Sequence, residues 1–189
     1  MSFTHKLRML HIMPMGYMAG FLNTFLCPLA LGGLIVIDNK FSFSNVFRFW
    51  EKSIKYSVNA LWLSPSMVSI VTKLTRDKDE VLWVKNNIAY VLVGTAPLSK
   101  QIYLNFLDKF NICCLESYGM TEALIISSNT KTHNSPQTVG KPLENVKVII
   151  DDSKTDLPEL YINTDSFYDG YYNDMENIIR GSMHSFHLP

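Results

Sequence analysis

The chain has 189 residues, of which 47% are hydrophobic, so it can bury one sizeable core or two small ones and is typical of a globular protein. Its 17 basic residues balance 17 acidic ones, and no basic run carries interleaved aromatic side chains. This balance argues against nucleic-acid binding and against attraction to an anionic membrane surface.

The cysteines and the N-terminus indicate the compartment. Cys27, Cys113 and Cys114 form neither an even disulfide framework nor a zinc-binding pair pattern, and the five histidines are scattered. The first residues lead into no apolar core followed by a small-residue cleavage site, so a secretory signal is not expected. These features predict a cytoplasmic protein.

The first predicted element lies in the uncharged residues 16–37, a segment about as long as a membrane span. Pro28 and the Gly32 and Gly33 pair interrupt it, and residues 34–37 have the β-branched content of a short buried strand. We therefore expect a helix followed by a buried strand and no membrane span. A membrane-associated protein anchored by this segment is the alternative.

Helical and strand-like segments alternate from here, which predicts an α/β fold. Ser44 is expected to cap a helix with Phe47 and Trp50 on one face. Residues 59–63 follow as a strand, and Ser64 precedes a second helix.

The next segments repeat this alternation. The charged residues 76–80 are expected to form a solvated loop, and residues 88–93 a buried strand. Ser99 is placed to cap a helix through residue 107, and residues 111–115 form another strand. In that strand Cys113 and Cys114 are expected to be buried on opposite faces. Two consecutive strands thus end in small-residue loops, as at a ligand crevice on the carboxyl edge of a sheet.

The second of these loops carries groups suited to a nucleotide. Tyr118 offers an aromatic face, Gly119 a close approach to the backbone, Thr121 a hydroxyl donor and Glu122 a carboxylate for Mg²⁺. The alternative is a strand-to-helix turn in which Thr121 caps a helix.

Two other segments are weaker candidates. The glycine and proline of residues 94–97 most often mark a plain turn, and it is their pairing with residues 116–122 that favours a site. Tyr17 could line a pocket, although aromatic and methionine side chains such as those around it usually pack in a core. No nucleophile elbow, Walker A loop or dinucleotide-binding glycine motif is present.

Five motifs follow one another in an order and spacing that resemble a known superfamily. They are Gly94, Thr95, Ala96, Pro97, Leu98 and Ser99; Glu116, Ser117, Tyr118, Gly119, Met120, Thr121 and Glu122; Gly140, Lys141 and Pro142; Glu159, Leu160, Tyr161 and Ile162; and Gly170, Tyr171, Tyr172 and Asn173. The superfamily comprises acyl-CoA synthetases, nonribosomal-peptide adenylation domains and luciferases. These adenylate-forming enzymes join a carboxylic acid, such as a fatty or aryl acid, to ATP and then transfer the acyl group to a thiol.

The resemblance implies a role for each matching residue. Tyr118 would stack on adenine, Thr121 would contact phosphate and Glu122 would bind Mg²⁺ and take part in catalysis with Thr121. Tyr17 would lie near the carboxylate substrate. The remaining nucleotide contacts would come from Gly94, Thr95, Ala96, Glu116, Ser117 and Gly119, and the acid would also meet Gly94, Gly119 and Met120. Coenzyme A, or a carrier-protein thiol, would accept the acyl group.

The chain also departs from the family pattern. We find no counterpart of the Ser/Thr/Gly-rich phosphate loop, of the ribose-binding Thr-Gly-Asp motif expected soon after Asn173, or of the C-terminal catalytic lysine. Pro158 replaces a usual glycine. The expectation is therefore part of a large N-terminal domain: an α/β portion over residues 1–130, a small β-rich subdomain over residues 131–175 and an unpatterned tail over residues 176–189.

These departures leave the activity of the chain open. Without the phosphate loop, the aspartate and the lysine, the isolated chain is expected to be inactive or nearly so. The alternative is a non-catalytic binding or assembly module, or one chain of a split ligase that a second chain complements. The identity of the acid is not readable from the sequence.

Overall fold

The structure is a computed structural model that describes residues 4–151 and 159–171, together with the backbone of residues 184–187. The chain divides into two compact units, residues 1–117 with 129–140, and residues 118–128 with 141–189. This division differs from the sequence-based one, because residues 118–128 belong to the second unit and residues 129–140 return to the first. Pro158 and residues 174–180 lie outside the described residues.

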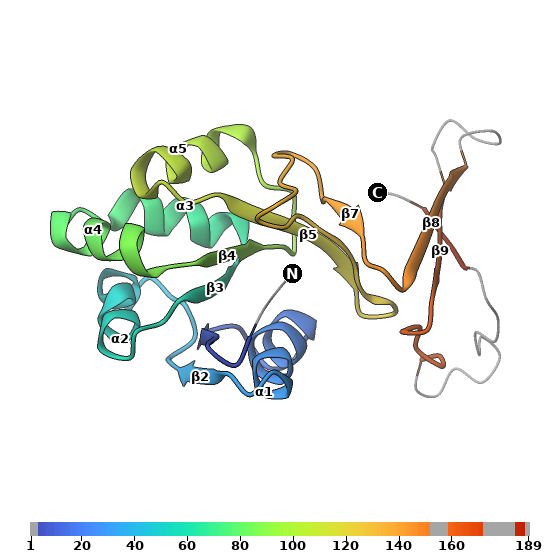
Figure 1. The fold of residues 1–189 in the computed structure, drawn as a ribbon, viewed down its shortest axis with the longest axis horizontal. Helices are drawn as coiled ribbons and strands as arrows, with labels where there is room; N and C mark the ends of the chain where they lie inside the picture. The colour runs from blue at the N-terminus through green and yellow to red at the C-terminus, as the bar shows by residue number, and fades with distance from the viewer. Residues whose placement is uncertain (1–3, 152–158, 172–183, 188–189) are drawn as a thin grey trace. The chain divides into compact units, whose positions relative to one another are not determined.

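The first unit contains a parallel sheet (Figure 1). Its strands are β1 (Arg8–His11), β2 (Leu34–Ile37), β3 (Ala60–Leu63), β4 (Tyr90–Val93) and β5 (Cys114–Met120). The order is β2-β1-β3-β4-β5, continued by β6 (Leu124–Ser128) and β7 (Lys141–Pro142). This architecture confirms the predicted α/β fold. The sequence analysis missed β1, because its residues Arg, Met, Leu and His include no β-branched side chain.

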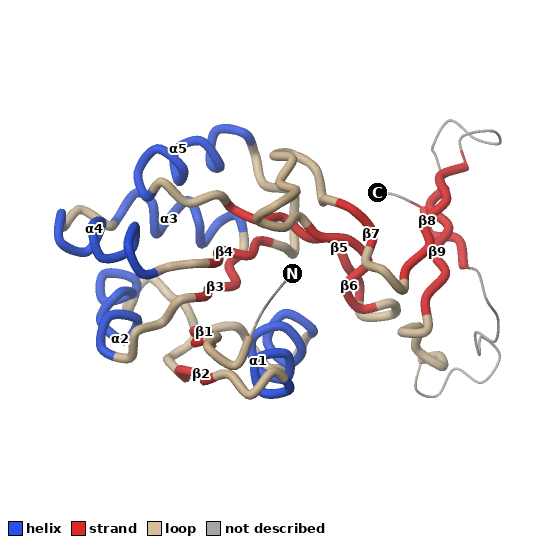
Figure 2. Tube along the Cα trace, viewed as in Figure 1, coloured by secondary structure: helices blue, strands red, loops and turns tan. Residues whose placement is uncertain are grey.

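Helices connect the parallel strands, as such connections require (Figure 2). The first is a π-helix, η1 (Ala19–Leu26), which passes directly into α1 (Cys27–Ala30). The others are η2 (Val46–Arg48, a 3₁₀ turn), α2 (Phe49–Lys55), α3 (Pro65–Leu74), α4 (Lys78–Asn87) and α5 (Lys100–Phe110).

The predicted cap at Ser99 is confirmed, Ser64 also caps the helix that it was expected to precede, and one predicted loop is wrong. The Ser64 hydroxyl accepts from the Met67 N–H at 3.3 Å, and Ser99 caps α5 in the same way. Residues 76–80, expected to be a loop, instead contain the start of α4. The Asp77 carboxylate accepts from the N–H groups of Asp79 and Glu80, so it supplies the partners that the first turn lacks.

The prediction for Ser44 and Phe47 is also wrong. The α-helix begins only at Phe49, after a 3₁₀ turn, and Ser44 does not cap it. Phe47 is 73% exposed whereas Trp50 is 2% exposed, so the two aromatic side chains do not share a buried face. A 3₁₀ turn has three residues per turn rather than 3.6, so Phe47 and Trp50 do not point in the directions that a continuous α-helix would give them.

Residues 16–37 form a helical segment and a strand, as expected, and no helix in the described part of the chain is long and apolar enough to span a membrane. Pro28 lies in the first turn of α1, and Gly32 turns the chain with φ at 69°. The expected burial of the strand is wrong. β2 is the terminal strand in the sheet order, and Leu34 and Ile37 are 42% and 64% exposed.

The core of the first unit lies between the sheet and its helices. All four residues of β3 are buried, and the rings of Trp50 and Phe110 meet edge to face at 5.9 Å. Asn111 ends α5 in a left-handed conformation, so β5 starts at Cys114 rather than at residue 111. Cys114 is 1% exposed, but Cys113 precedes the strand and is exposed, which contradicts its expected burial.

The second unit contains a three-stranded antiparallel sheet in the order β10-β9-β8. Its strands are β8 (Val146–Asp151), β9 (Glu159–Thr164) and β10 (His184–His187). The unit has its own apolar core, formed by Ala123, Ile126, Val146, Leu160 and Ile162. The predicted β-rich character is therefore confirmed. β10 lies in the tail expected to be without pattern, and it forms a strand because its backbone pairs with β9.

Candidate functional site

The loop after β4 presents backbone and small side chains to solvent. Gly94 is buried, and a Cβ placed on it would lie 3.3 Å from Trp62 Cζ2, so a side chain there would press on the ring. Thr95 follows with φ at 74°, an uncommon conformation for a residue other than glycine. Residues 95–97 are exposed, so a ligand can reach them.

The Glu116 side chain holds this loop in place through hydrogen bonds. Its carboxylate is buried and accepts from the Leu98 N–H at 3.3 Å and from the Gln137 N–H at 3.1 Å. Its main-chain oxygen accepts from the Asn129 N–H at 2.8 Å. Ser117 Oγ donates to the Val93 carbonyl at 3.4 Å. Within the first unit the structure thus joins the segments around Gly94 and Glu116, as the pairing of the two motifs predicted.

Tyr17 lies two residues before η1, with its side chain 48% exposed. Its carbonyl accepts from the N–H groups of Gly20 and Phe21, both at 3.1 Å. Nearby, the end of β1 holds a buried polar pair that sequence reasoning missed, in which His11 Nδ1 and Thr24 Oγ1 are 2.7 Å apart. Burial lowers the pKa of His11 from its usual value. His11 and Thr24 are 13 positions apart in the sequence, so no local motif marks this pair.

In the second unit, the motif continues as a hairpin rather than as a loop. Tyr118, Gly119 and Met120 complete β5, and residues 121–123 turn the chain into β6 (Figure 2). The alternative in which Thr121 caps a helix is therefore wrong, because the next element is a strand. Tyr118 and Met120 pack against the apolar core of this unit, and burial raises the pKa of Tyr118.

Gly119 has a structural role in this hairpin. A Cβ placed on it would lie 2.3 Å from the Leu124 carbonyl oxygen and 3.0 Å from Ile125 Cα. Real Cβ atoms do not approach backbone so closely, so any other residue would force the strands apart. The close approach predicted for Gly119 is thus present, but to the neighbouring strand.

Glu122 is held by two tyrosines. The Tyr171 hydroxyl donates to Glu122 Oε1 at 2.5 Å, and the Tyr168 N–H donates to the Glu122 carbonyl at 2.9 Å. The two tyrosine rings meet edge to face at 5.0 Å. The hydrogen bond to Glu122 raises the pKa of Tyr171, so the phenol stays protonated and donates. Sequence reasoning missed this contact, although Tyr171 belongs to one of the quoted motifs.

The carboxylate of Glu122 fits Mg²⁺ better than a metal that needs a protein cage. In the described residues, no three His, Cys, Asp or Glu side chains gather as a metal site. Mg²⁺ is usually held by one or two carboxylates together with phosphate and water. Tyr171 engages Oε1, which leaves Oε2 for a cation.

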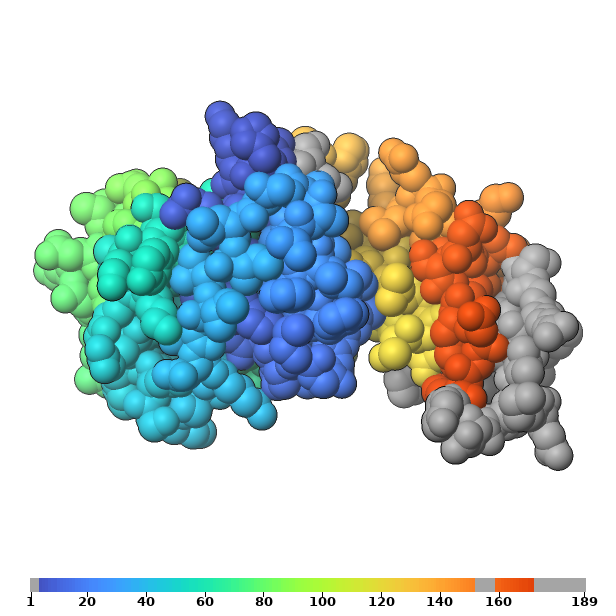
Figure 3. Space-filling view, turned by 90° about the horizontal axis from the view of Figure 1, so that it is seen from below, coloured from blue at the N-terminus to red at the C-terminus, as the bar shows by residue number. Residues whose placement is uncertain are grey.

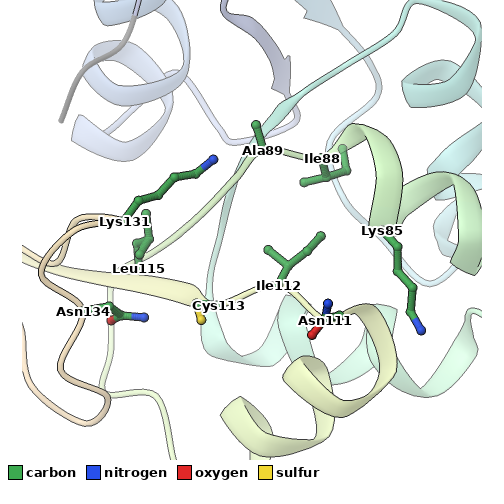
Figure 4. Close-up of a pocket in the computed structure, with 9 residues that line it drawn as sticks. All are labelled: Lys85, Ile88, Ala89, Asn111, Ile112, Cys113, Leu115, Lys131 and Asn134. Carbon is green, nitrogen blue, oxygen red and sulfur yellow. The ribbon is translucent and has the colours of Figure 1, made fainter.

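A cavity of about 340 Å³ lies in the first unit beside the amino ends of β4 and β5 (Figure 4). It is lined by the residues just before β4 and β5, among them Ile88 and Cys113, and by Lys131 and Asn134. Gly94 follows the other end of β4, whereas Glu116 is the third residue of β5 and directly follows Leu115, which lines the cavity.

The chain belongs to the AMP-binding enzyme family, whose family model matches residues 1–172. The malonate–CoA ligase of Arabidopsis thaliana is 25% identical over 190 residues, which cover 91% of this chain and 31% of that enzyme. The 4-coumarate–CoA ligase 2 of Nicotiana tabacum is 28% identical over 186 residues, covering 91% of this chain and 33% of that enzyme. The chain thus spans about a third of the length of these relatives.

Solved structures show the same fold. ATP-bound MatB from Rhodopseudomonas palustris has a TM-score of 0.79 and 20% identity, over 93% of this chain and 35% of that one. The anthranilate CoA ligase AuaEII, in complex with anthranoyl-AMP, has a TM-score of 0.82 and 12% identity, over 96% of this chain and 36% of that one. These similarities confirm the expected architecture of part of an adenylate-forming enzyme.

Proposed function

We propose that this chain forms the nucleotide- and acid-binding part of an AMP-forming carboxylate–CoA ligase. The observation that carries this proposal is the placement of two family motifs on adjacent parallel strands. The 94–99 loop follows β4, and residues 116–120 lie in β5, with Glu116 hydrogen-bonded to the loop. Ligands of open α/β sheets bind beyond the carboxyl ends of such strands.

The proposed nucleotide contacts differ in kind. Thr95 and Ala96 are exposed and can offer backbone groups, whereas the buried Glu116 contributes by fixing the loop. Ser117 supports the end of β4 in the same way. Tyr118 is half-buried against an apolar core, which would leave part of its ring for the adenine.

Thr121 and Glu122 are the proposed catalytic residues. Thr121 is exposed in the turn after β5, where its hydroxyl can donate to a phosphate oxygen. Glu122 would hold Mg²⁺ through Oε2, in keeping with the single carboxylate that a phosphate-bound Mg²⁺ requires. When bound, the ion would offset the charge that develops on the transferring phosphate.

The proposed reaction has two steps. A carboxylate oxygen attacks the α-phosphorus of ATP and expels pyrophosphate, and the thiol sulfur then attacks the acyl carbon and expels AMP. The acid would lie near Tyr17, Gly94, Gly119 and Met120. The relatives named above act on malonate and on 4-coumarate, so we propose only a carboxylic acid as substrate and CoA, or a carrier-protein thiol, as acceptor.

A chimera tests the assignment. Residues 4–171 of this chain would replace the matching third of a malonate–CoA ligase, and acid-dependent pyrophosphate release would be measured. We expect release in the chimera, loss of at least about tenfold on Glu122→Gln, and no loss on the matched exposed variant Glu144→Gln. A soluble, folded chimera without release, or equal effects of both variants, would contradict the proposal.

The isolated 189-residue polypeptide should not complete the reaction, because it lacks the phosphate loop, the ribose-binding motif and the lysine that the family uses. With ATP, Mg²⁺ and a panel of carboxylic acids, we expect no pyrophosphate above the level without protein. Robust release would show that these elements are dispensable.

A second candidate function is a non-catalytic association module or one chain of a split ligase. The exposed Leu34 and Ile37 on the terminal strand β2 favour it, since an apolar strand edge is a ready pairing surface.

A cytoplasmic location stays a prediction, and a relative from Mus musculus is described as mitochondrial.

A further inference from the structure

The hydroxyl of Tyr171 lies on the carboxylate of Glu122, although the two residues are 49 positions apart in the sequence. The hydroxyl donates to Oε1 at 2.5 Å, a length typical of a hydrogen bond from a hydroxyl to a charged carboxylate. Glu122 is half-buried in the turn between β5 and β6. A glutamate side chain has several rotamers, and this bond selects among them.

The segment that carries Tyr171 is anchored to the second unit at three points. Phe167 packs against the apolar core of this unit. The Tyr168 N–H donates to the Glu122 carbonyl at 2.9 Å, which ties the two backbones together. Gly170 has φ at 140°, a conformation that residues with a Cβ rarely adopt. The backbone thus turns at Gly170, between two tyrosines that both meet Glu122.

The Tyr171 side chain is held by specific contacts rather than by burial. It is 58% exposed, so it contributes little to the apolar core. Its ring meets the Tyr168 ring edge to face at 5.0 Å, and its hydroxyl meets Glu122. Both contacts lie within the second unit. The direction from which the hydroxyl approaches Oε1 is therefore set by the fold of this unit.

A carboxylate held in this way is prepared to bind a cation. In protein metal sites the ligating carboxylates are themselves hydrogen-bonded, and these partners orient the ligand. Tyr171 engages Oε1, which leaves Oε2 for the ion. Mg²⁺ demands a nearly ideal octahedral arrangement of oxygens, so its affinity depends on where each ligand oxygen lies.

We propose that Tyr171 is a positioning residue for the metal ion, because its hydroxyl fixes the Glu122 carboxylate so that Oε2 is presented to Mg²⁺. This inference rests on the proposed function, in which Glu122 is the metal ligand. It extends that function, since Tyr171 sets the affinity of the site without touching the metal, the nucleotide or the acid.

A second tyrosine–glutamate pair in the same unit provides a matched comparison. The Tyr161 hydroxyl donates to Glu159 Oε2 at 2.5 Å, and both residues lie on β9. This bond has the same chemistry and the same length, but Glu159 is not a proposed ligand. Removing each hydroxyl in turn therefore separates a role in metal binding from the general effect of losing such a bond.

The test follows binding of Mn²⁺ to the full 189-residue chain by NMR. Mn²⁺ takes the same oxygen ligands as Mg²⁺, and as a paramagnetic ion it broadens the resonances of nearby amides. The amides of Ala123 and Tyr168 are the reporters, because Ala123 follows Glu122 and the Tyr168 N–H is bonded to the Glu122 carbonyl. In the wild-type chain both should broaden as Mn²⁺ is added, and excess Mg²⁺ should reverse the effect.

Tyr171→Phe should raise the Mn²⁺ concentration that gives half-maximal broadening about tenfold, as is typical when a partner that orients a metal ligand is removed. Tyr161→Phe should leave this concentration unchanged. Circular dichroism of both variants establishes that they are folded. The proposal is overturned if Tyr171→Phe binds Mn²⁺ as the wild type does, or if both tyrosine variants lose affinity equally.

Glu122→Gln distinguishes failure of this inference from failure of the proposed function. We expect this variant to show no broadening of the two reporter amides. If they broadened as in the wild type, or if the wild type itself showed no broadening, the metal role of Glu122 would fail and the role of Tyr171 with it. If only Glu122→Gln had an effect, Glu122 would remain the ligand and the positioning role alone would be rejected.

Discussion

Gly119 is required by the hairpin that contains it, whatever the neighbouring residues bind. In family motifs a glycine is often read as room for a ligand, and the sequence supports that interpretation. The structure supplies a second reason, since the Leu124 carbonyl oxygen occupies the space of a Cβ. Stability measurements on Gly119 variants will therefore report on the hairpin, whereas activity measurements will also report on the room for a ligand.

Gly119→Ala should lower the free energy of unfolding by about 2 kcal/mol, because the added methyl group collides with backbone that cannot move independently. Urea denaturation would measure the loss. Gly16→Ala is the matched control, since nothing lies within 4 Å of a Cβ at that position. Equal stability of the two variants would show that the hairpin can open without cost.

His11 predicts a pH dependence of stability. Burial lowers its pKa below the usual 6.5, so below pH 6.5 the unfolded chain binds a proton that the folded chain does not. The contribution of His11 is therefore fully present above pH 6.5 and is lost as pH falls toward the folded-state pKa.

Chemical denaturation between pH 7.5 and 5 (about the window in which histidine titrates) would measure this dependence. The fall in unfolding free energy should be smaller in His11→Gln than in the wild type. His133→Gln, which changes an exposed histidine, should behave as the wild type does. An unchanged slope in His11→Gln would mean that other groups dominate.

At the scale of elements, α4 depends on a cap that the sequence analysis took for part of a loop. The run Arg76 to Glu80 has the charge of a solvated segment, and the following residues are only weakly amphipathic. Asp77 nevertheless starts a helix, because its carboxylate accepts two N–H groups of the first turn. Asp79 and Glu80 add favourable negative charge at the same end.

Asp77→Ala should destabilise the chain by about 1 kcal/mol, as is typical for removal of an N-cap. Asp77→Asn retains an accepting oxygen and should recover most of the loss. Hydrogen exchange of the α4 amides would localise the effect. If alanine and asparagine gave the same stability, the side-chain hydrogen bonds would not contribute.

On the scale of the whole molecule, exposed apolar side chains gather in one part of the chain. In Figure 3 the blue segment that carries them covers much of the face turned to the viewer. Ile37 is 64% exposed on β2, and Phe43 and Phe47 just beyond it are 79% and 73% exposed. A terminal strand with such neighbours is prone to pair with another polypeptide.

Ile37→Lys should therefore reduce self-association, because a charge on a terminal strand opposes pairing of edges. Sedimentation velocity at rising protein concentration would measure it. Leu82→Lys is the control, since Leu82 is similarly exposed, at 57%, but lies on α4, where the backbone is already hydrogen-bonded. If both variants associated to the same extent, the strand edge would not be the contact.

The accuracy of sequence reasoning varied with the range of the interactions involved. The cap at Ser99, the helix start at Ser64 and the strands that became β3 and β4 follow from patterns within a few residues, and they are confirmed. The predicted limits of this strand, residues 111–115, were wrong, because β5 runs from Cys114 to Met120. Residues 116–120, which carry the motif, form a strand only because they pair with neighbouring strands. The exposure of β2 was also wrong, since burial depends on what lies beside a strand and not on its own composition.

By itself, the sequence determined the α/β class, the order of the motifs and the family, because periodicity, capping residues and motif chemistry are local properties of the chain. The tertiary structure decided how the motif residues are used. It bound Glu116 to the 94–99 loop, placed Tyr171 on Glu122 and set Gly119 against Leu124. These contacts join residues 5 to 49 positions apart, and only the folded backbone brings such residues within hydrogen-bonding or van der Waals distance.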